Sequence, residues 1–208
     1  MKKIVYTILL LTMGFALNSK ADTNTNSTFL DHTSVTLEEE FRFKEGDFYY
    51  EHTDISGKYK FNDHVDVFGG YRLILQDKGL GFKDQSMFIP GFNLKTSDSK
   101  YGKLTLRSRV EIGLNTSPTP TSYQLTEYLK YNTPWKLTKF KINPFIGDET
   151  FFDCSHQMDF NKNRAYAGLD YQFTKKIKGS TYYFRESNKK NNNWTDSNVV
   201  VTQVKFEF

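Results

Sequence analysis

The chain has 208 residues, of which 16% are aromatic and 25% are charged. Its mean hydropathy is −0.61, and no apolar run after residue 21 approaches the roughly 18 residues of a membrane-spanning helix, so a helical membrane protein is not expected. The 28 lysines and arginines include three in the first 21 residues, which leaves 25 against 24 acidic residues. A nearly neutral chain gives no basis for binding nucleic acid.

The first predicted element is a signal peptide over residues 1–21. Met1-Lys2-Lys3 supplies positive charge, an apolar run extends from Ile4 to Leu17, and Ser19-Lys20-Ala21 has the small-x-small pattern of a cleavage site. The alternative, a retained membrane anchor, is weaker because the run falls short of the roughly 20 residues that a spanning helix needs. Residues 22–208 are then expected to form one domain.

The rest of the chain alternates apolar and polar residues in one segment after another. Clusters rich in Asn, Asp, Gly, Ser, Thr and Lys separate the segments, a pattern that predicts β-strands joined by turns. Most segments have at least the roughly nine to eleven residues that a tilted strand needs to cross a bilayer. We expect about ten strands, over residues 34–44, 48–61, 64–76, 86–96, 102–114, 122–131, 139–152, 163–173, 178–187 and 198–208.

The two faces of the predicted strands differ in kind. In the segment 102–114, Leu104 and Leu106 share one face, whereas Arg107 and Arg109 share the other. In a soluble sandwich the charged face would be solvated, but about ten one-sided strands would then have to pair into a core. The pattern therefore favours an all-β fold, an antiparallel up-and-down transmembrane β-barrel of about ten strands with aromatic residues at its two interfaces.

The last predicted strand, 198–208, places an apolar face against a polar one and ends on Phe208. It resembles the terminal strand of outer-membrane proteins, in which a final phenylalanine serves as an assembly signal. We therefore expect the barrel-assembly machinery to bind this strand. Outer-membrane lipid and lipopolysaccharide are the other expected partners, and the bacterial (Gram-negative) outer membrane is the expected location.

The lengths of the links between strands give a predicted orientation. Residues 77–85, 115–121, 153–162 and 188–197 read as longer polar links, whereas 62–63, 97–101 and 174–177 read as tight turns. Two links depart from this alternation, since 132–138 is long for a turn and 45–47 is short for an outer loop. Outer-membrane barrels have short periplasmic turns and longer extracellular loops, so both termini are expected on the periplasmic side. The link 188–197 is the candidate contact loop for glycans or acidic lipid headgroups, through Lys189, Lys190 and Trp194. The alternative is a solvated polar loop.

If the apolar faces point outward, charged residues of both signs meet inside the barrel. A barrel of about eight strands is filled by side chains, whereas open aqueous channels belong to about sixteen. A porin-like or structural barrel with a charged, largely plugged lumen is therefore expected, although the arginines could instead form a ladder that attracts anions. The predicted lumen charge network consists of Glu38, Glu40, Arg42, Arg72, Arg107, Arg109, Glu111, Glu149 and Arg164.

The sequence indicates no metal site and no cofactor. His32, His52 and His64 lie far apart and have no metal-ligand spacing. Cys154 is the only cysteine, which excludes an intramolecular disulfide and suggests an inert loop residue.

A hydrolase is a further alternative, although no catalytic residue is assigned. The local cluster with suitable chemistry lies at the end of the seventh strand, where a histidine beside carboxylates could act as general base on a serine. Its members are Asp148, Glu149, Asp153, Ser155 and His156. Adjacent loop residues rarely point at one another, so an enzyme is not the expectation.

Four segments carry a family resemblance: Tyr71-Arg72, residues 107–111, residues 143–152 and residues 163–171. In this order they resemble the bacterial family named domain of unknown function 2490, whose members are taken to be outer-membrane barrels without an assigned activity. The resemblance implies fold and location but no mechanism. In that family the sixth strand is often rich in arginine, whereas residues 123–131 contain none here.

Overall fold

The computed structural model describes residues 32–77, 79, 81–114, 122–139, 141–155, 158–190 and 193–208. The predicted signal peptide, residues 1–21, lies outside them. The described residues form ten strands and no helix long and apolar enough to cross a membrane. The strands are β1 Thr33–Lys44, β2 Asp47–Lys60, β3 Val65–Asp77, β4 Phe82–Lys95, β5 Lys103–Leu114, β6 Tyr123–Asn132, β7 Asn143–Asp153, β8 Asp159–Gln172, β9 Ile177–Lys190 and β10 Asn193–Glu207.

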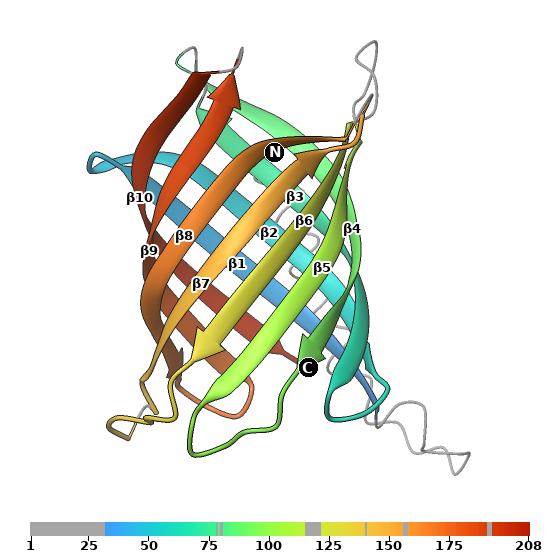
Figure 1. The fold of residues 1–208 in the computed structure, drawn as a ribbon, viewed down its shortest axis with the longest axis vertical. Coiled ribbons are helices and arrows are strands. Elements are labelled where there is room, and N and C mark those ends of the chain that lie inside the picture. Colours follow the sequence, from blue (N-terminus) through green and yellow to red (C-terminus); the bar gives the residue numbers. More distant parts are fainter. Residues whose placement is uncertain are drawn as a thin grey trace.

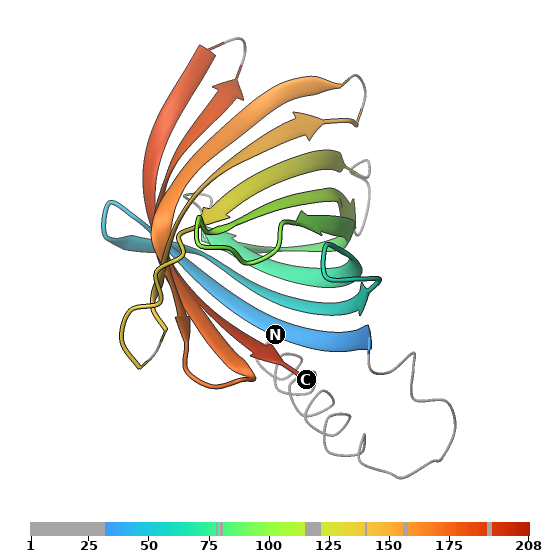
Figure 2. The same cartoon turned by 60° about the horizontal axis from the view of Figure 1, so that its bottom comes forward.

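The strands close into a single antiparallel barrel. Each strand pairs with its neighbours in the chain, and β1 pairs with β10 to complete the circle (Figures 1 and 2). This closing register runs from Thr36 opposite Glu207 to Lys44 opposite Val199. The backbones of Val35 and Phe208 also exchange hydrogen bonds, at 3.2 and 2.9 Å. The prediction of an antiparallel barrel of about ten strands is confirmed.

The faces of the strands divide as predicted. Successive strand residues point to opposite faces, so Val200 and Val201 separate to the outside and the inside. Val200 is 49% exposed, whereas Val201 is fully buried in the lumen beside Arg42, its partner across β1 and β10. Large apolar side chains such as Leu104 and Phe88 are exposed on the outer wall. A broad apolar outer face and a charged interior are therefore features of the whole barrel.

An aromatic cluster fills one side of the lumen. Phe184, Val199 and Val201 form its centre, and tyrosines from β2, β8 and β9 pack against them. A β-bulge helps to place one of these, because the β1–β2 register shifts between Arg42 and Phe43. A bulge inserts one unpaired residue and bends its strand, so Tyr49 joins the cluster beside Tyr50.

The predicted contrast between long and short links is wrong. Only residues 191–192 separate β9 from β10, and only 78–81 separate β3 from β4, whereas the ten residues 133–142 lie between β6 and β7 at the end where β1 begins and β10 ends. Polar clusters predict turns, but backbone hydrogen bonding continues through them, so β9 and β10 pair as far as Lys190 and Asn193 (Figure 1). We refer to the end with links 61–64, 96–102, 133–142 and 173–176 as the terminal end of the barrel.

Candidate functional site

A chain of ion pairs crosses the middle of the lumen from β2 to β9. Its carboxylates and guanidinium groups alternate, so most charges have an opposite charge on each side. We refer to it as the charge belt. The pairs are Asp54–Arg72 at 2.6 Å, Arg72–Glu111 at 3.7 Å, Glu111–Arg109 at 2.8 Å, Arg109–Glu149 at 3.1 Å, Glu149–Arg164 at 3.6 Å and Arg164–Glu186 at 2.6 Å.

A second group of charges lies on β1 beside the belt. Arg42 donates to Glu40 at 2.6 Å, and its guanidinium lies 4.0 Å from the centre of the Tyr50 ring. Tyr182 and Gln203 also donate to Glu40, at 2.6 and 3.1 Å. Because this carboxylate has several donors, its charge is compensated inside the barrel despite its burial.

These groups are buried although they point into the lumen. Arg42 is 7% exposed and Glu149 is 4% exposed, and Arg72, Glu111 and Arg164 are also buried. Side chains that line an open aqueous channel would be accessible to water. Their low exposure means that neighbouring side chains cover these charged groups at this level of the barrel.

The structure joins eight of the nine predicted network residues to an oppositely charged side chain. Glu38 belongs to this set because Lys205 Nζ lies 2.5 Å from Glu38 Oε2. Arg107 is the exception: within the described parts of the chain it has no ion pair. Its Nε donates to the Asn93 side chain at 3.1 Å, and its guanidinium lies 5.8 Å from the centre of the Phe68 ring.

A cavity of about 460 Å³ extends from the belt toward the terminal end. It reaches that end because Lys136 and Lys141, on the link between β6 and β7, belong to its wall. Among the described residues in the wall, eleven are lysine or arginine and five are aspartate or glutamate. Four further carboxylates pair with cations of the wall, Asp54, Glu111 and Glu186 with arginines and Asp98 with Lys136, so positive charge remains in excess.

The excess is located at identifiable side chains. Lys58 and Lys178 both form ion pairs with the single carboxylate of Glu207, and Lys58 Nζ lies 3.3 Å from Glu207 Oε1. Arg107 has no ion pair among the described residues, and the same holds for Lys141. The unmatched positive charge therefore lies in the cavity rather than in the belt.

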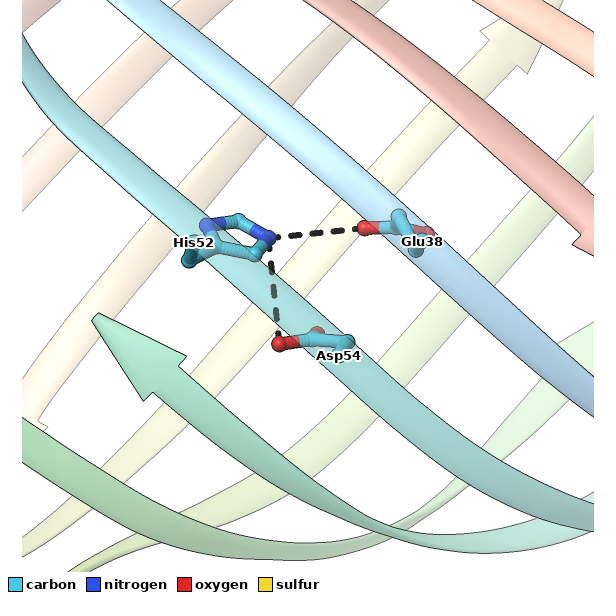
Figure 3. Close-up of side chains that lie close together, drawn as sticks. All are labelled: Glu38, His52 and Asp54. Carbon is cyan, nitrogen blue, oxygen red and sulfur yellow. Dashed lines mark ion pairs between the residues drawn. The ribbon is translucent and has the colours of Figure 1, made fainter. Parts of the chain in front are cut away.

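Sequence reasoning missed several lumen residues. Asp54 and Glu186 end the belt, and Tyr166 donates to Glu149 within it. Histidine spacing alone predicts no site at His52, yet its side chain is 2% exposed and faces Glu38 and Asp54 (Figure 3). The alternation of Tyr50, His52, Asp54 and Ser56 along one face of β2 is the sequence pattern that indicates a lumen position for His52 and Asp54.

The carboxylates at the terminal end have shifted pKa values. A hydrogen bond from Lys60, at 2.6 Å, lowers the pKa of Asp63 in the link between β2 and β3. A hydrogen bond from Lys103, together with its charge, lowers the pKa of Asp98 in the next link at this end. Both turns therefore favour ionised carboxylates at the terminal end of the barrel.

The predicted contact loop at 188–197 is a β-hairpin, which corrects that prediction. Lys189 forms an ion pair with Asp159 at 2.9 Å, and Trp194 packs against Phe160 with ring centres 5.3 Å apart. Lys190 is opposite Asn193 in the last pair of the ladder. These side chains are part of the strands and their packing, so no free loop presents them.

The described members of the hydrolase cluster make one contact with each other, a hydrogen bond of 2.8 Å from the Ser155 backbone N–H to Asp153 Oδ1, and it does not involve the Ser155 hydroxyl. Asp148 and Glu149 point to opposite faces of β7, where Asp148 accepts from Asn163 and Glu149 belongs to the belt. Ser155 Oγ accepts a hydrogen bond from the Tyr123 backbone at 3.1 Å. His156 lies outside the described residues. Cys154 is exposed and unpaired.

Comparison with known proteins places the chain in a family. The model of the family described as "Protein of unknown function (DUF2490)" matches residues 21–197. The chain belongs to this family. The resemblance inferred from the sequence is thereby confirmed, and a search of curated proteins found no match.

Several solved barrels are similar to this member of the DUF2490 family. A KdgM porin has 15% identity and a TM-score of 0.42, with 84% of this chain and 99% of that chain covered. The translocator domain of the autotransporter NalP from Neisseria meningitidis has 11% identity and a TM-score of 0.44, with 100% and 98% covered. Ail, the attachment invasion locus protein of Yersinia pestis, has 12% identity and a TM-score of 0.25, with 85% and 96% covered.

Proposed function

We propose that this protein is a β-barrel of the bacterial outer membrane whose lumen is closed by the charge belt. The apolar outer wall supports a membrane location, since leucine, valine and phenylalanine side chains are exposed around the barrel. The closed sheet supports it too, because a barrel has no unpaired edge strand to place in lipid. In this proposal lipid and lipopolysaccharide surround the outer wall, and the barrel-assembly machinery acts on the strand ending at Phe208.

The burial of the belt is the observation on which the closed lumen rests. An open path would have to pass between side chains that are at most about a sixth exposed and are joined in one chain of ion pairs. Removing one partner from a buried pair costs roughly 3–5 kcal/mol. Spontaneous opening of several such pairs would therefore be rare, and we expect the barrel to be a closed structure rather than a general pore.

We further propose that the basic cavity receives a small anionic solute from the terminal end. A concave wall with excess positive charge concentrates anions, and Arg107 offers a planar set of donors that no carboxylate of the described chain occupies. The belt forms the floor of the cavity, so the solute would bind there without crossing. The barrel would act as a binding protein anchored in the membrane.

Calorimetric titration tests this binding. Refolded mature protein in detergent is titrated with inorganic phosphate and, separately, with malonate, at low and high salt. We expect saturable binding that high salt weakens, because screening reduces attraction between exposed charges. Arg107→Met should weaken it by about tenfold or more, whereas Arg185→Met, on the outer wall, should leave it unchanged. Equal binding to wild type and Arg107→Met, or no saturation with either anion, would refute the proposed cavity function.

A further inference from the structure

A buried histidine lies against two carboxylates on the lumen side of β1 and β2. The distance from His52 Nε2 is 3.6 Å to Glu38 Oε1 and 3.8 Å to Asp54 Oδ1 (Figure 3). The three ligand atoms all lie within 4.8 Å of one another. The strand register brings them together, because Glu38 is opposite Asp54 and His52 is one lumen-facing position away on β2.

The two nitrogens of His52 have different surroundings. Nδ1 lies 3.2 Å from the Tyr50 hydroxyl and 3.6 Å from Glu40 Oε1, so a proton on Nδ1 has acceptors within reach. Nε2 is buried and has no hydrogen-bond partner among the described residues. Metal-bound histidines show the same asymmetry: one nitrogen donates to a neighbouring oxygen and the other presents its lone pair to the ion.

We propose that Glu38, His52 and Asp54 bind a divalent transition-metal ion, with Zn²⁺ as the reference case. One imidazole and two carboxylates are ligands that Zn²⁺ accepts at bonds of about 2.0–2.2 Å. Tetrahedral geometry with such bonds separates the ligand atoms by roughly 3.4 Å. The observed separations from Nε2 exceed this by a few tenths of an ångström, and the two carboxylate oxygens lie within 4.8 Å of each other, so side-chain rotations have to draw the three ligand atoms together.

The carboxylates are held in place by groups that remain compatible with a bound ion. Gln203 donates to Glu38 Oε1 at 2.7 Å, and Arg72 donates to both oxygens of Asp54 at 2.6 Å. Hydrogen bonds of this kind orient metal-binding carboxylates in other proteins. Glu38 and His52 also belong to the wall of the cavity, which leaves a fourth position open to water or to a small anion.

Two cations compete with the metal, Arg72 at Asp54 and Lys205 at Glu38, and Lys205 is the more exposed of the two. Its ammonium lies 2.5 Å from Glu38 Oε2, but its side chain is 29% exposed and borders the cavity, so it can turn away. A dication near an ammonium group is repelled, and replacement of Lys205 by an uncharged residue should strengthen metal binding. A purely structural histidine gives no reason for such an effect.

The test uses refolded mature protein that has been stripped with EDTA and is titrated with Zn²⁺ by calorimetry and with Co²⁺ by visible absorption. We expect one ion per chain. His52→Gln and Asp54→Asn should each weaken binding by more than about tenfold. His64→Gln is the matched control, because it removes an exposed histidine from the turn after β2 and should leave binding unchanged.

Lys205→Met should tighten binding by about tenfold, whereas Lys136→Met, elsewhere on the cavity wall, should have little effect. If the His52 and Asp54 variants do not fold, ¹⁵N NMR of wild-type histidines replaces them, and Zn²⁺ should shift the His52 Nε2 resonance. No binding to folded wild type, binding unaffected by His52→Gln, or a shift confined to other histidines would overturn the proposal. The result is independent of whether phosphate or malonate binds in the cavity.

Discussion

Arg109 lies at the centre of the charge belt, and its replacement by methionine should destabilise the barrel strongly. Its Nη2 is 2.8 Å from Glu111 Oε1 and 3.1 Å from Glu149 Oε1, and all three side chains are close to fully buried. At an effective dielectric constant of about 20, each contact is worth roughly 5 kcal/mol before the desolvation of the ions is subtracted. Loss of one partner from such a buried group costs roughly 3–5 kcal/mol in total.

The expected value is at the lower end of this range, about 3 kcal/mol in the free energy of unfolding. Glu149 retains Arg164 at 3.6 Å and Glu111 retains Arg72 at 3.7 Å, so neither carboxylate is left without a cation. Urea unfolding of the refolded protein in lipid vesicles, followed by tryptophan fluorescence and by heat-modifiable gel migration, measures the change.

Arg185→Met is the matched control, because Arg185 pairs with Asp196 at 2.5 Å in an exposed position on the hairpin of β9 and β10, outside the lumen and away from the terminal end. It should have a far smaller effect, since exposed ion pairs contribute little. Combining Arg109→Met with Glu149→Gln should cost less than the two single changes together, because the double variant removes both partners of one ion pair. Equal destabilisation by Arg109→Met and Arg185→Met would refute the role assigned to the belt.

Three further predictions concern the wall and the turns. Gly91→Ala should impair folding, because its Cβ would lie 2.5 Å from the Ser108 carbonyl oxygen and 2.6 Å from the Phe68 ring, whereas Gly57→Ala, with open space, should fold normally in the same gel-shift assay. Phe88→Arg should lower stability in vesicles by about 2–4 kcal/mol if the outer wall meets lipid, and Phe61→Arg, on a turn, should change it much less. NMR titration should find that the pKa of the Asp98 carboxyl lies below its ordinary value of 3.8, and Lys103→Met should return this pKa toward the ordinary value. The stabilisation that the ionised carboxylate gives to the turn is present above pH 3.8 and is lost as the pH falls through the lowered pKa.

The sequence was sufficient for the barrel because alternation is a local property. The separation of Leu104 from Arg107 requires only that side chains alternate along a strand, and the structure has this arrangement. The sequence did not predict the hairpin of β9 and β10, because this pairing depends on contacts between two strands and not on a local pattern. Asparagine, aspartate and serine favour turns, but residues 186–190 pair with residues 193–197 in the strand ladder. Arg185 and Ser187 both donate to Asp196 across this hairpin and stabilise it.

The candidate sites depend on register, which the sequence does not specify. Eight of the nine predicted lumen charges do find opposite charges, since any barrel with this pattern places them inside. The register between neighbouring strands decides which of these charges form ion pairs and leaves Arg107 without one among the described residues. His52 illustrates the limit, because its approach to Glu38 requires that Glu38 lie opposite Asp54 on the neighbouring strand.

The closed lumen is tested most directly by single-channel recording of refolded mature protein in planar bilayers, after heat-modifiable migration has shown that it is folded. We predict no steady conductance in salt gradients of either sign, because the belt residues are buried and paired across the lumen. Reproducible openings of constant size from the folded wild-type protein would contradict the closed barrel, and their reversal potential would show whether the arginines select for anions.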